Sequence, residues 1–266
     1  MTFMYPRLEM KSALEHFSSQ GNCLKMTTGS GELDSLIDGI QEGLFYLFYG
    51  DSLPLDALSH RLLVNCIKSV KEHGFESMAI CFNNTDYYSR GKMTLNPEKI
   101  ANIAKGARID PKIVSKNLFI QTAYNSQHQL QIANEVSELI QNNGNIKLIV
   151  INNLTKFFKD SSGHNRPEIA NTLKEVTSII NRACARNKIS LVVTGNSNLS
   201  SKGVIPRPIG GSYLKHIADI IAYVKDISMK AFLPTFKATL VKHQYLNTPK
   251  SVLVHGRKAR GMMLLN

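Results

Sequence analysis

The residues with the clearest chemical implication form the turn after the hydrophobic run Leu44–Tyr49, and they read Gly50-Asp51-Ser52-Leu53-Pro54-Leu55-Asp56-Ala57. A working phosphate loop at such a turn has the pattern G-x-x-x-x-G-K-S/T. Its glycines admit phosphate to the backbone N–H groups, its lysine neutralises the phosphate and its hydroxyl holds magnesium. Only Gly50 is retained, because Leu55, Asp56 and Ala57 replace the second glycine, the lysine and the hydroxyl residue. Since an acidic side chain repels triphosphate, we do not expect ATP hydrolysis here.

Alternating strands and helices are expected to position this turn. Short apolar runs rich in β-branched or aromatic residues predict strands at Leu44–Tyr49, Ser77–Phe82, Leu118–Gln121, Lys147–Ile151, Ser190–Thr194 and Ile220–Val224. Segments with apolar residues three and four apart predict helices at Pro54–Glu72, Pro97–Ala107, Gln127–Asn142 and Pro167–Asn187. The pattern indicates an α/β fold with a mainly parallel sheet and helices on both faces. Two later alternating segments, Lys230–His243 and Ser251–His255, predict a C-terminal antiparallel extension.

Upstream of the turn, the chain reads Thr27-Thr28-Gly29-Ser30-Gly31-Glu32-Leu33-Asp34-Ser35-Leu36. This segment resembles the entry into the first strand of archaeal RadA-type recombinases. Further segments are similar to that family in the same order, namely Asn96–Ile100, Ala123–Gln129, Lys147–Thr155 and Pro208–His216. Together they cover roughly Leu8 to His255. The resemblance to the RecA/RadA family implies a RecA-like P-loop NTPase core.

The resemblance also implies where the remaining ATP chemistry would be. The strand that ends in the Walker B aspartate of the family ends here in Asn152. Thr85 stands in place of the water-activating glutamate, and Asn196 in place of a sensor glutamine. Threonine is no general base near neutral pH, and a neutral amide is a poor partner for magnesium. We therefore expect a pseudo-ATPase with degenerate Walker motifs and no cofactor, with weak residual nucleotide binding left open.

Two loops correspond to the DNA-binding loops of the resembling family, Lys156–Pro167 and Ser197–Gly211. Basic side chains in and beside them are the candidate contacts to single-stranded DNA: Lys156, Lys159, Arg166, Lys202, Arg207 and Lys215. The alternative is that these are ordinary solvated loops, with Phe157 and Phe158 packed into the domain.

The N-terminal segment carries a candidate contact to a protein partner. Met10-Lys11-Ser12-Ala13 is similar to the F-x-x-A element by which such recombinases assemble, which implies that Met10 and Ala13 dock on a RadA-type recombinase or another paralogue. The alternative is a helix, Leu8–Ser18, whose Met10 packs on its own core. We expect an arm over residues 1–24 and one core domain over 25–266. Because fewer than thirty residues precede Thr27, the helical DNA-binding module of full-length relatives is not expected, which is typical of a short paralogue.

Composition restricts the class of protein. The 266 residues carry a formal net charge of +12, which favours phosphate-rich partners. The four cysteines form no C-x-x-C pair, so neither a zinc site nor a disulfide framework is indicated. Neither a signal peptide nor an apolar run long enough for a membrane span is found, so we expect a cytoplasmic protein without membrane contact.

The leading hypothesis is a non-catalytic RadA-like recombinase paralogue that binds single-stranded DNA, a partner recombinase or both, and so modulates homologous recombination and DNA repair. One alternative is a structural pseudo-ATPase subunit that pairs with an ATP-competent paralogue and does not contact DNA. Another is an ATPase of the recombinase or KaiC type with an unconventional pocket.

Overall fold

A computed structural model describes residues 23–85, 95–160, 166–198, 205–228, 234–259 and 262–265. Its centre is a large sheet in the order β12-β11-β10-β9-β3-β7-β6-β4-β5. Six strands that are neighbours in this spatial order, from β9 at one end to β5 at the edge, are parallel. They are β3 (Phe45–Gly50), β4 (Met78–Asn84), β5 (Leu118–Ala123), β6 (Ile146–Asn152), β7 (Ser190–Asn198) and β9 (Ile220–Asp226). Three antiparallel strands extend it: β10 (Thr235–Lys242), β11 (Lys250–Ala259) and β12 (Met262–Leu265). The strands β1 (Lys25–Met26) and β2 (Ile40–Gln41) form a separate two-stranded sheet, and the short strand β8 (Arg207–Pro208) pairs with β7.

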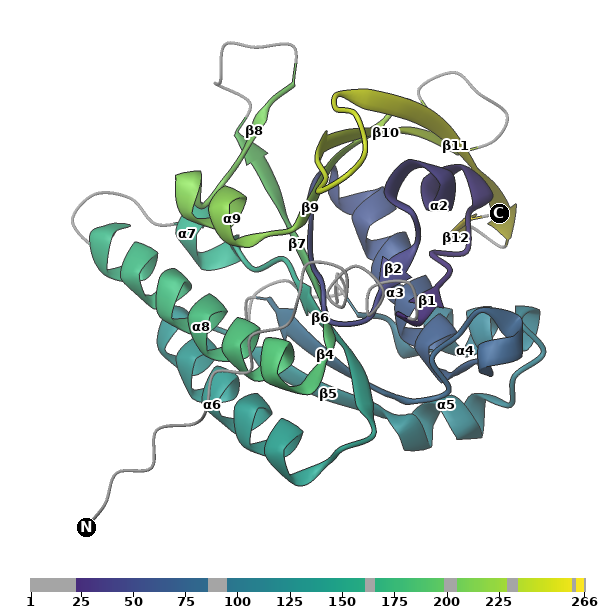
Figure 1. Cartoon of the computed structure of the whole chain (residues 1–266), viewed down its shortest axis with the longest axis horizontal. Coiled ribbons are helices and arrows are strands. Elements are labelled where there is room, and N and C mark those ends of the chain that lie inside the picture. Colours follow the sequence, from purple (N-terminus) through teal and green to yellow (C-terminus); the bar gives the residue numbers. More distant parts are fainter. Residues whose placement is uncertain are drawn as a thin grey trace, which may run out of the picture.

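Helices cover both faces of the parallel strands (Figure 1). One face carries α2 (Gly31–Ile37), α3 (Ser52–Ile67), α4 (Pro97–Gly106) and α5 (Pro111–Asn117). The other carries α6 (Ser126–Asn142), α8 (Arg166–Asn187) and α9 (Gly211–Ile217), with the short α7 (Lys156–Asp160) beside them. The central strand β3 alternates between the two cores, with Tyr46 and Phe48 in the first and Phe45, Leu47 and Tyr49 in the second. The predicted fold class is therefore confirmed, including the antiparallel extension.

Several predicted boundaries were wrong. The helix expected at Pro54–Glu72 begins two residues earlier, at Ser52, and ends at Ile67, before a short 3-10 turn over Val70–Glu72. Its end is determined by the returning chain, because Phe75 and Ser77 both donate backbone hydrogen bonds to the Cys66 carbonyl. All six predicted parallel strands extend further toward their carboxyl ends, and the extension is longest in β7, which ends at Asn198. The predicted N-terminal helix Leu8–Ser18 lies outside the described residues, as do residues 230–233 of the predicted C-terminal strand.

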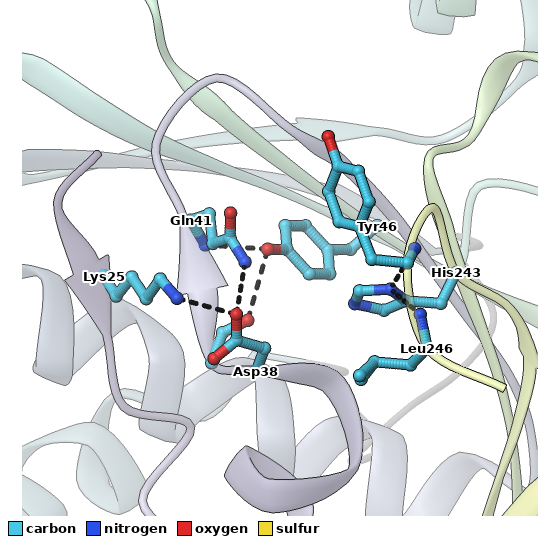
Figure 2. A network of polar contacts seen from close by, with 8 residues as sticks. Lys25, Asp38, Gln41, Tyr46, His243 and Leu246 are labelled. Carbon is cyan, nitrogen blue, oxygen red and sulfur yellow. Dashed lines mark hydrogen bonds and ion pairs between the residues drawn. The ribbon is translucent and has the colours of Figure 1, made fainter. Parts of the chain in front are cut away.

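A polar network before β3 ties the β1–β2 pair to the core, and a separate set of contacts lies within the β10–β11 turn (Figure 2). The Tyr46 hydroxyl accepts a hydrogen bond from the Gln41 backbone at 2.7 Å, and its buried position raises the pKa of Tyr46. Asp38 pairs with Lys25 at 2.6 Å and accepts a hydrogen bond from Gln41 at 3.0 Å. His243 Nδ1 accepts the N–H groups of Tyr245 and Leu246, each at 3.1 Å. These contacts are structural.

Candidate functional site

Gly50 is the last residue of β3 and has a close packing neighbour. Its φ of +141° is rarely adopted by L side chains, and a Cβ at this position would collide with the carbonyl oxygen of Val224 on the neighbouring β9. The same carbonyl accepts the Asp51 N–H at 3.0 Å. Packing between β3 and β9 is therefore sufficient reason for a glycine here, without any phosphate.

Helix α3 begins at Ser52, immediately after its N-cap residue Asp51, so no open loop separates the helix from β3. Pro54 lacks an N–H group, and the Leu55 N–H is directed to the Asp51 carbonyl at 3.4 Å. A phosphate loop works by leaving several successive N–H groups free for the ligand. Here only the N–H groups of Ser52 and Leu53 precede the helical hydrogen bonding, so the residues present do not fit a triphosphate.

A cavity of about 390 Å³ lies at this end of β3, β7 and β9, lined by Gly50, Asp51, Ser52, Leu53, Asn196, Ser197 and Asp226. Two of the lining side chains are carboxylates. Asp51 accepts the Asp226 N–H at 2.7 Å, and Asp226 accepts the Ser228 N–H at 2.9 Å. Because like charges repel, a carboxylate pair makes this cavity unfavourable for the phosphates of a nucleotide.

Asp56 occupies the place of the phosphate-loop lysine and is directed toward a different part of the fold. Burial raises the pKa of Asp56 to about 7, and the positive charge of Lys99 on α4 partly opposes that rise. The Asp56 carbonyl also contacts His60 Nδ1, while His60 Nε2 accepts the Asn96 N–H at 2.9 Å. This position on α3 therefore belongs to the α3–α4 contact.

Buried amides occupy the carboxyl ends of β4 and β6. Asn152 is fully buried, and its Nδ2 donates to the Cys81 sulfur at 3.6 Å. Asn84 donates to the Asn152 carbonyl at 2.7 Å and accepts from Gln129 Nε2 at 2.9 Å, and Gln129 Nε2 also reaches the Leu154 carbonyl at 3.0 Å. The network is neutral, whereas a magnesium site requires oxygen ligands that usually include carboxylates.

Asn196 and Thr85, the other two residues predicted in place of ATP-site residues of the family, lie near this edge. Asn196 donates from Nδ2 to Asn153 at 2.9 Å, and its N–H donates to Thr155 Oγ1 at 3.2 Å. Thr85 follows Asn84 and donates its N–H to the Ala123 carbonyl at 3.0 Å. Gly50, Thr85, Asn152 and Asn196 thus lie at the carboxyl edge of the sheet. Leu55, Asp56 and Ala57 lie instead on α3, where Leu55 is buried in the core, Ala57 packs against it and Asp56 belongs to the contact with α4.

Two segments that resemble the family, Thr27–Leu36 and Ala123–Gln129, form hydrogen bonds that stabilise the fold. Asp34 accepts hydrogen bonds from the Thr27 hydroxyl at 2.5 Å and from the backbone and hydroxyl of Thr28 at 2.7 and 2.6 Å, which holds the turn before α2. Asn125 caps α6 by accepting the His128 N–H at 2.7 Å. These segments therefore retain a folding role without any nucleotide chemistry.

The structure describes three of the candidate DNA contacts, and they lie on separate elements. Lys156 begins α7, after the turn that follows β6, and exposed Arg207 on β8 pairs with Asn198 at the end of β7. Lys215 is instead near the opposite edge, where Lys242 Nζ donates to its carbonyl at 3.1 Å. Phe157 packs against the core on the α6–α8 side, as the alternative reading expected for it. Lys202, Met10 and Ala13 lie outside the described residues, as do the side chains of Lys159 and Arg166.

Two basic residues that sequence reasoning missed lie on one face of the antiparallel extension. Register pairs Lys237 with Lys225 on β9 and with Leu253 on β11, so the three side chains project from the same face. Both lysines are exposed, and Leu253 is 48% exposed. We call this surface the β9–β11 face. The signal available in the sequence was the alternation of polar and apolar residues in Lys237-Ala238-Thr239, which is typical of a strand with one face toward solvent.

The β9–β11 face adjoins the β8 region. Tyr223 lies in the next row of this face and packs on Tyr49, with ring centroids 5.3 Å apart. The Tyr49 hydroxyl donates to the carbonyl of Pro206, the residue before β8, at 2.8 Å. Lys225, Lys237 and Arg207 thus belong to neighbouring parts of the surface.

The described residues include no group of three or more His, Cys, Asp or Glu side chains arranged to hold a metal ion. Every helix among them is too short or too polar to cross a membrane. Cys66, Cys81 and Cys184 are buried thiols whose pKa is raised by burial.

Comparison with known proteins identifies the class to which this fold and edge belong. The Rad51 family model matches residues 19–229, and the chain belongs to that family. Among its relatives is the DNA repair and recombination protein RadA of Methanococcus maripaludis strain C5, which is 27% identical over 231 residues, covering 79% of this chain and 69% of the relative. RadA of Methanococcus voltae is 27% identical over 241 residues, covering 82% of this chain and 71% of the relative.

Proposed function

We propose that this chain is a non-catalytic RadA-like paralogue that binds single-stranded DNA and a partner recombinase, and thereby modulates homologous recombination and DNA repair. Family membership supports the general role, since the relatives are DNA repair and recombination proteins. The observation that carries the non-catalytic part is the start of α3 at Ser52, directly after β3.

The absence of ATP turnover is supported by three features of one edge. The backbone before α3 offers few free N–H groups, the adjacent cavity carries the carboxylates of Asp51 and Asp226, and the Walker B position is the buried amide of Asn152. Phosphoryl transfer depends on positioning and neutralising the phosphates, and each of these features opposes that. The role is therefore that of a pseudo-ATPase.

DNA binding is supported by charge and by placement. Exposed Arg207 and the two lysines of the β9–β11 face lie on neighbouring parts of the surface, and the whole chain carries a net charge of +12. Lysine and arginine side chains bind nucleic acid by releasing counterions from the phosphates, without ATP. Met10 and Ala13 remain the proposed contact to a partner recombinase.

The test is a fluorescence-anisotropy titration of a labelled single-stranded oligonucleotide with the full chain, at low and moderate salt, with and without ATP and magnesium. We expect affinity that falls steeply with salt and is the same with and without nucleotide. Parallel assays should show no phosphate release above the no-enzyme background. Measurable ATP turnover would contradict the non-catalytic part, and no DNA binding at low salt would favour the structural subunit that does not contact DNA.

A further inference from the structure

One histidine organises the turn between β10 and β11. This β10–β11 turn covers residues 243–249, between the last residue of β10 and the first of β11. His243 Nδ1 accepts the backbone N–H groups of both Tyr245 and Leu246, each at 3.1 Å (Figure 2). A ring nitrogen accepts hydrogen bonds only while it carries no proton. The turn in this conformation therefore requires a neutral imidazole whose single proton is on Nε2.

The surroundings of the His243 ring favour that neutral form. Burial is the largest influence and lowers the pKa of His243, and the positive charge of Lys25 on β1 acts in the same direction. The Ile37 carbonyl and the carboxylate of Asp38, at the end of α2, act in the opposite direction. Asp38 is itself paired with Lys25 at 2.6 Å, so the two charges largely offset each other.

The residues on either side of His243 are anchored elsewhere. Lys242 Nζ donates to the Ala218 carbonyl at 2.5 Å, at the end of α9. Gln244 Nε2 donates to the Asp219 carboxylate at 2.9 Å. The Nε2 atom of His243 is buried and makes no hydrogen bond with the described residues, although the Ile37 carbonyl is near. The imidazole thus has its defined contacts at Nδ1, toward the turn.

We propose that protonation of His243 opens the β10–β11 turn, by removing the two hydrogen bonds that hold the backbone of Tyr245 and Leu246. A proton on Nδ1 would face two N–H donors with no acceptor between them, so both bonds would be lost. The strands on either side stay paired, because their backbone register runs from Thr235–His255 to Leu240–Lys250.

The turn is a pH-sensitive element that controls an exposed apolar pair. In the closed turn, the side chains of Tyr245 and Leu246 are 64% and 39% exposed. Since the pKa of His243 lies below its ordinary value, the closed turn is the form at neutral pH. Its stabilising contribution is complete above about pH 6.5 and is lost as pH falls below that. This property depends neither on DNA binding nor on the absence of ATP turnover.

The test is an NMR titration of the isotope-labelled full chain between pH 8 and pH 5. At neutral pH, the His243 ring should show a bare Nδ1 and a protonated Nε2. As pH falls, hydrogen exchange at the amides of Tyr245 and Leu246, corrected for its intrinsic dependence on pH, should become about tenfold faster or more. Exchange at the amides of β10 and β11 should not change with it.

Two variants separate the acceptor from the titration. His243→Asn keeps a side-chain acceptor that does not titrate, so both amides should stay protected at both ends of the pH range. His243→Ala removes the acceptor, so both amides should exchange rapidly throughout. The matched control is His73→Asn, at an exposed position whose φ of +57° asparagine tolerates, and it should respond to pH like the unaltered chain.

Three results would overturn the proposal. One is a proton on Nδ1 of His243 at neutral pH, which is incompatible with its two N–H donors. Another is exchange at the two amides that is independent of pH in the unaltered chain. The third is a pH response that persists in His243→Asn, because another titrating group would then open the turn.

Discussion

The carboxyl edge of β4 and β6 and the β9–β11 face belong to one sheet but differ in charge, since the first is neutral and the second is positive. At the first, the side chains of Asn84, Gln129 and Asn152 are buried and neutral, and they bond mainly to one another and to the backbone. At the second, Lys225 and Lys237 are exposed and carry charge into solvent. A buried charge must be paired to be tolerated, whereas an exposed one is free to bind phosphate.

This difference separates two properties of the chain. The edge where family resemblance implies ATP chemistry carries a buried network of neutral amides, whereas the β9–β11 face carries exposed positive charge. The proposed absence of turnover and the proposed DNA binding are therefore compatible within one fold. Four variants test this comparison.

The largest effect is expected from Gly50→Ala. The added Cβ would meet the Val224 carbonyl, and a φ of +141° is unfavourable for alanine, so the free energy of unfolding should fall by about 3 kcal/mol or more. Urea unfolding measures this, with Gly144→Ala as the control because nothing lies within 4 Å of a Cβ there. Equal stability of the two variants would remove the packing explanation for Gly50.

Asn152→Asp should restore the Walker B residue type without restoring its chemistry. A carboxylate buried among neutral groups should destabilise the fold by about 2–4 kcal/mol at pH 8. Its folded pKa would lie above the unfolded value, so stability should decrease as pH rises between those two values.

Urea unfolding of Asn152→Asp at pH 5 and pH 8, with and without magnesium chloride, tests this expectation. Asn134→Asp, at an exposed position of α6, is the control. Stabilisation by magnesium or the appearance of ATP turnover would mean that the edge still holds a usable metal site.

Lys225→Glu with Lys237→Glu should weaken single-stranded DNA binding by about 10- to 100-fold at low salt and reduce the slope of log affinity against log salt concentration by about 1.4. The control Lys174→Glu with Arg186→Glu makes the same charge change elsewhere. Anisotropy titrations at several salt concentrations measure both quantities. If the two double variants bind equally, net charge rather than the β9–β11 face determines the affinity.

The smallest effect is expected from Asp56→Asn. Because burial raises the pKa of Asp56 to about 7, the folded chain holds a proton that the unfolded chain releases above about pH 4, and this contribution destabilises the fold as pH rises toward 7. The substitution should therefore raise stability by about 1 kcal/mol at pH 8 and much less at pH 5.

Thermal unfolding between pH 5 and pH 8 measures the effect of Asp56→Asn, and Glu138→Gln on an exposed turn of α6 is its control. A pH profile identical to that of the control would mean that the Asp56 carboxyl is solvated in the folded chain.

Local patterns were sufficient for much of the fold. The apolar runs predicted all six parallel strands, because strands buried on both faces are nearly continuous in hydrophobic residues. Short elements such as α2, α5, α9 and β12 were not predicted, since few residues of each contact the core and their limits depend on contacts elsewhere in the chain. The stop of α3 at Ile67 is one such case, because residues up to ten positions later form its end.

Residue types and spacing alone predict the alternating α/β pattern and establish the excess of positive charge, and together with the family resemblance they predict that the phosphate-loop lysine and hydroxyl are replaced. They do not establish that α3 begins directly after β3, that Asp56 is directed toward α4, or that Lys225 and Lys237 share one face. Those features depend on hydrogen bonds and strand register between segments far apart in the chain, such as Asp51 with Val224 and Lys237 with Lys225. Such pairings arise only when the segments pack together, because no local preference encodes which distant strand will be the neighbour.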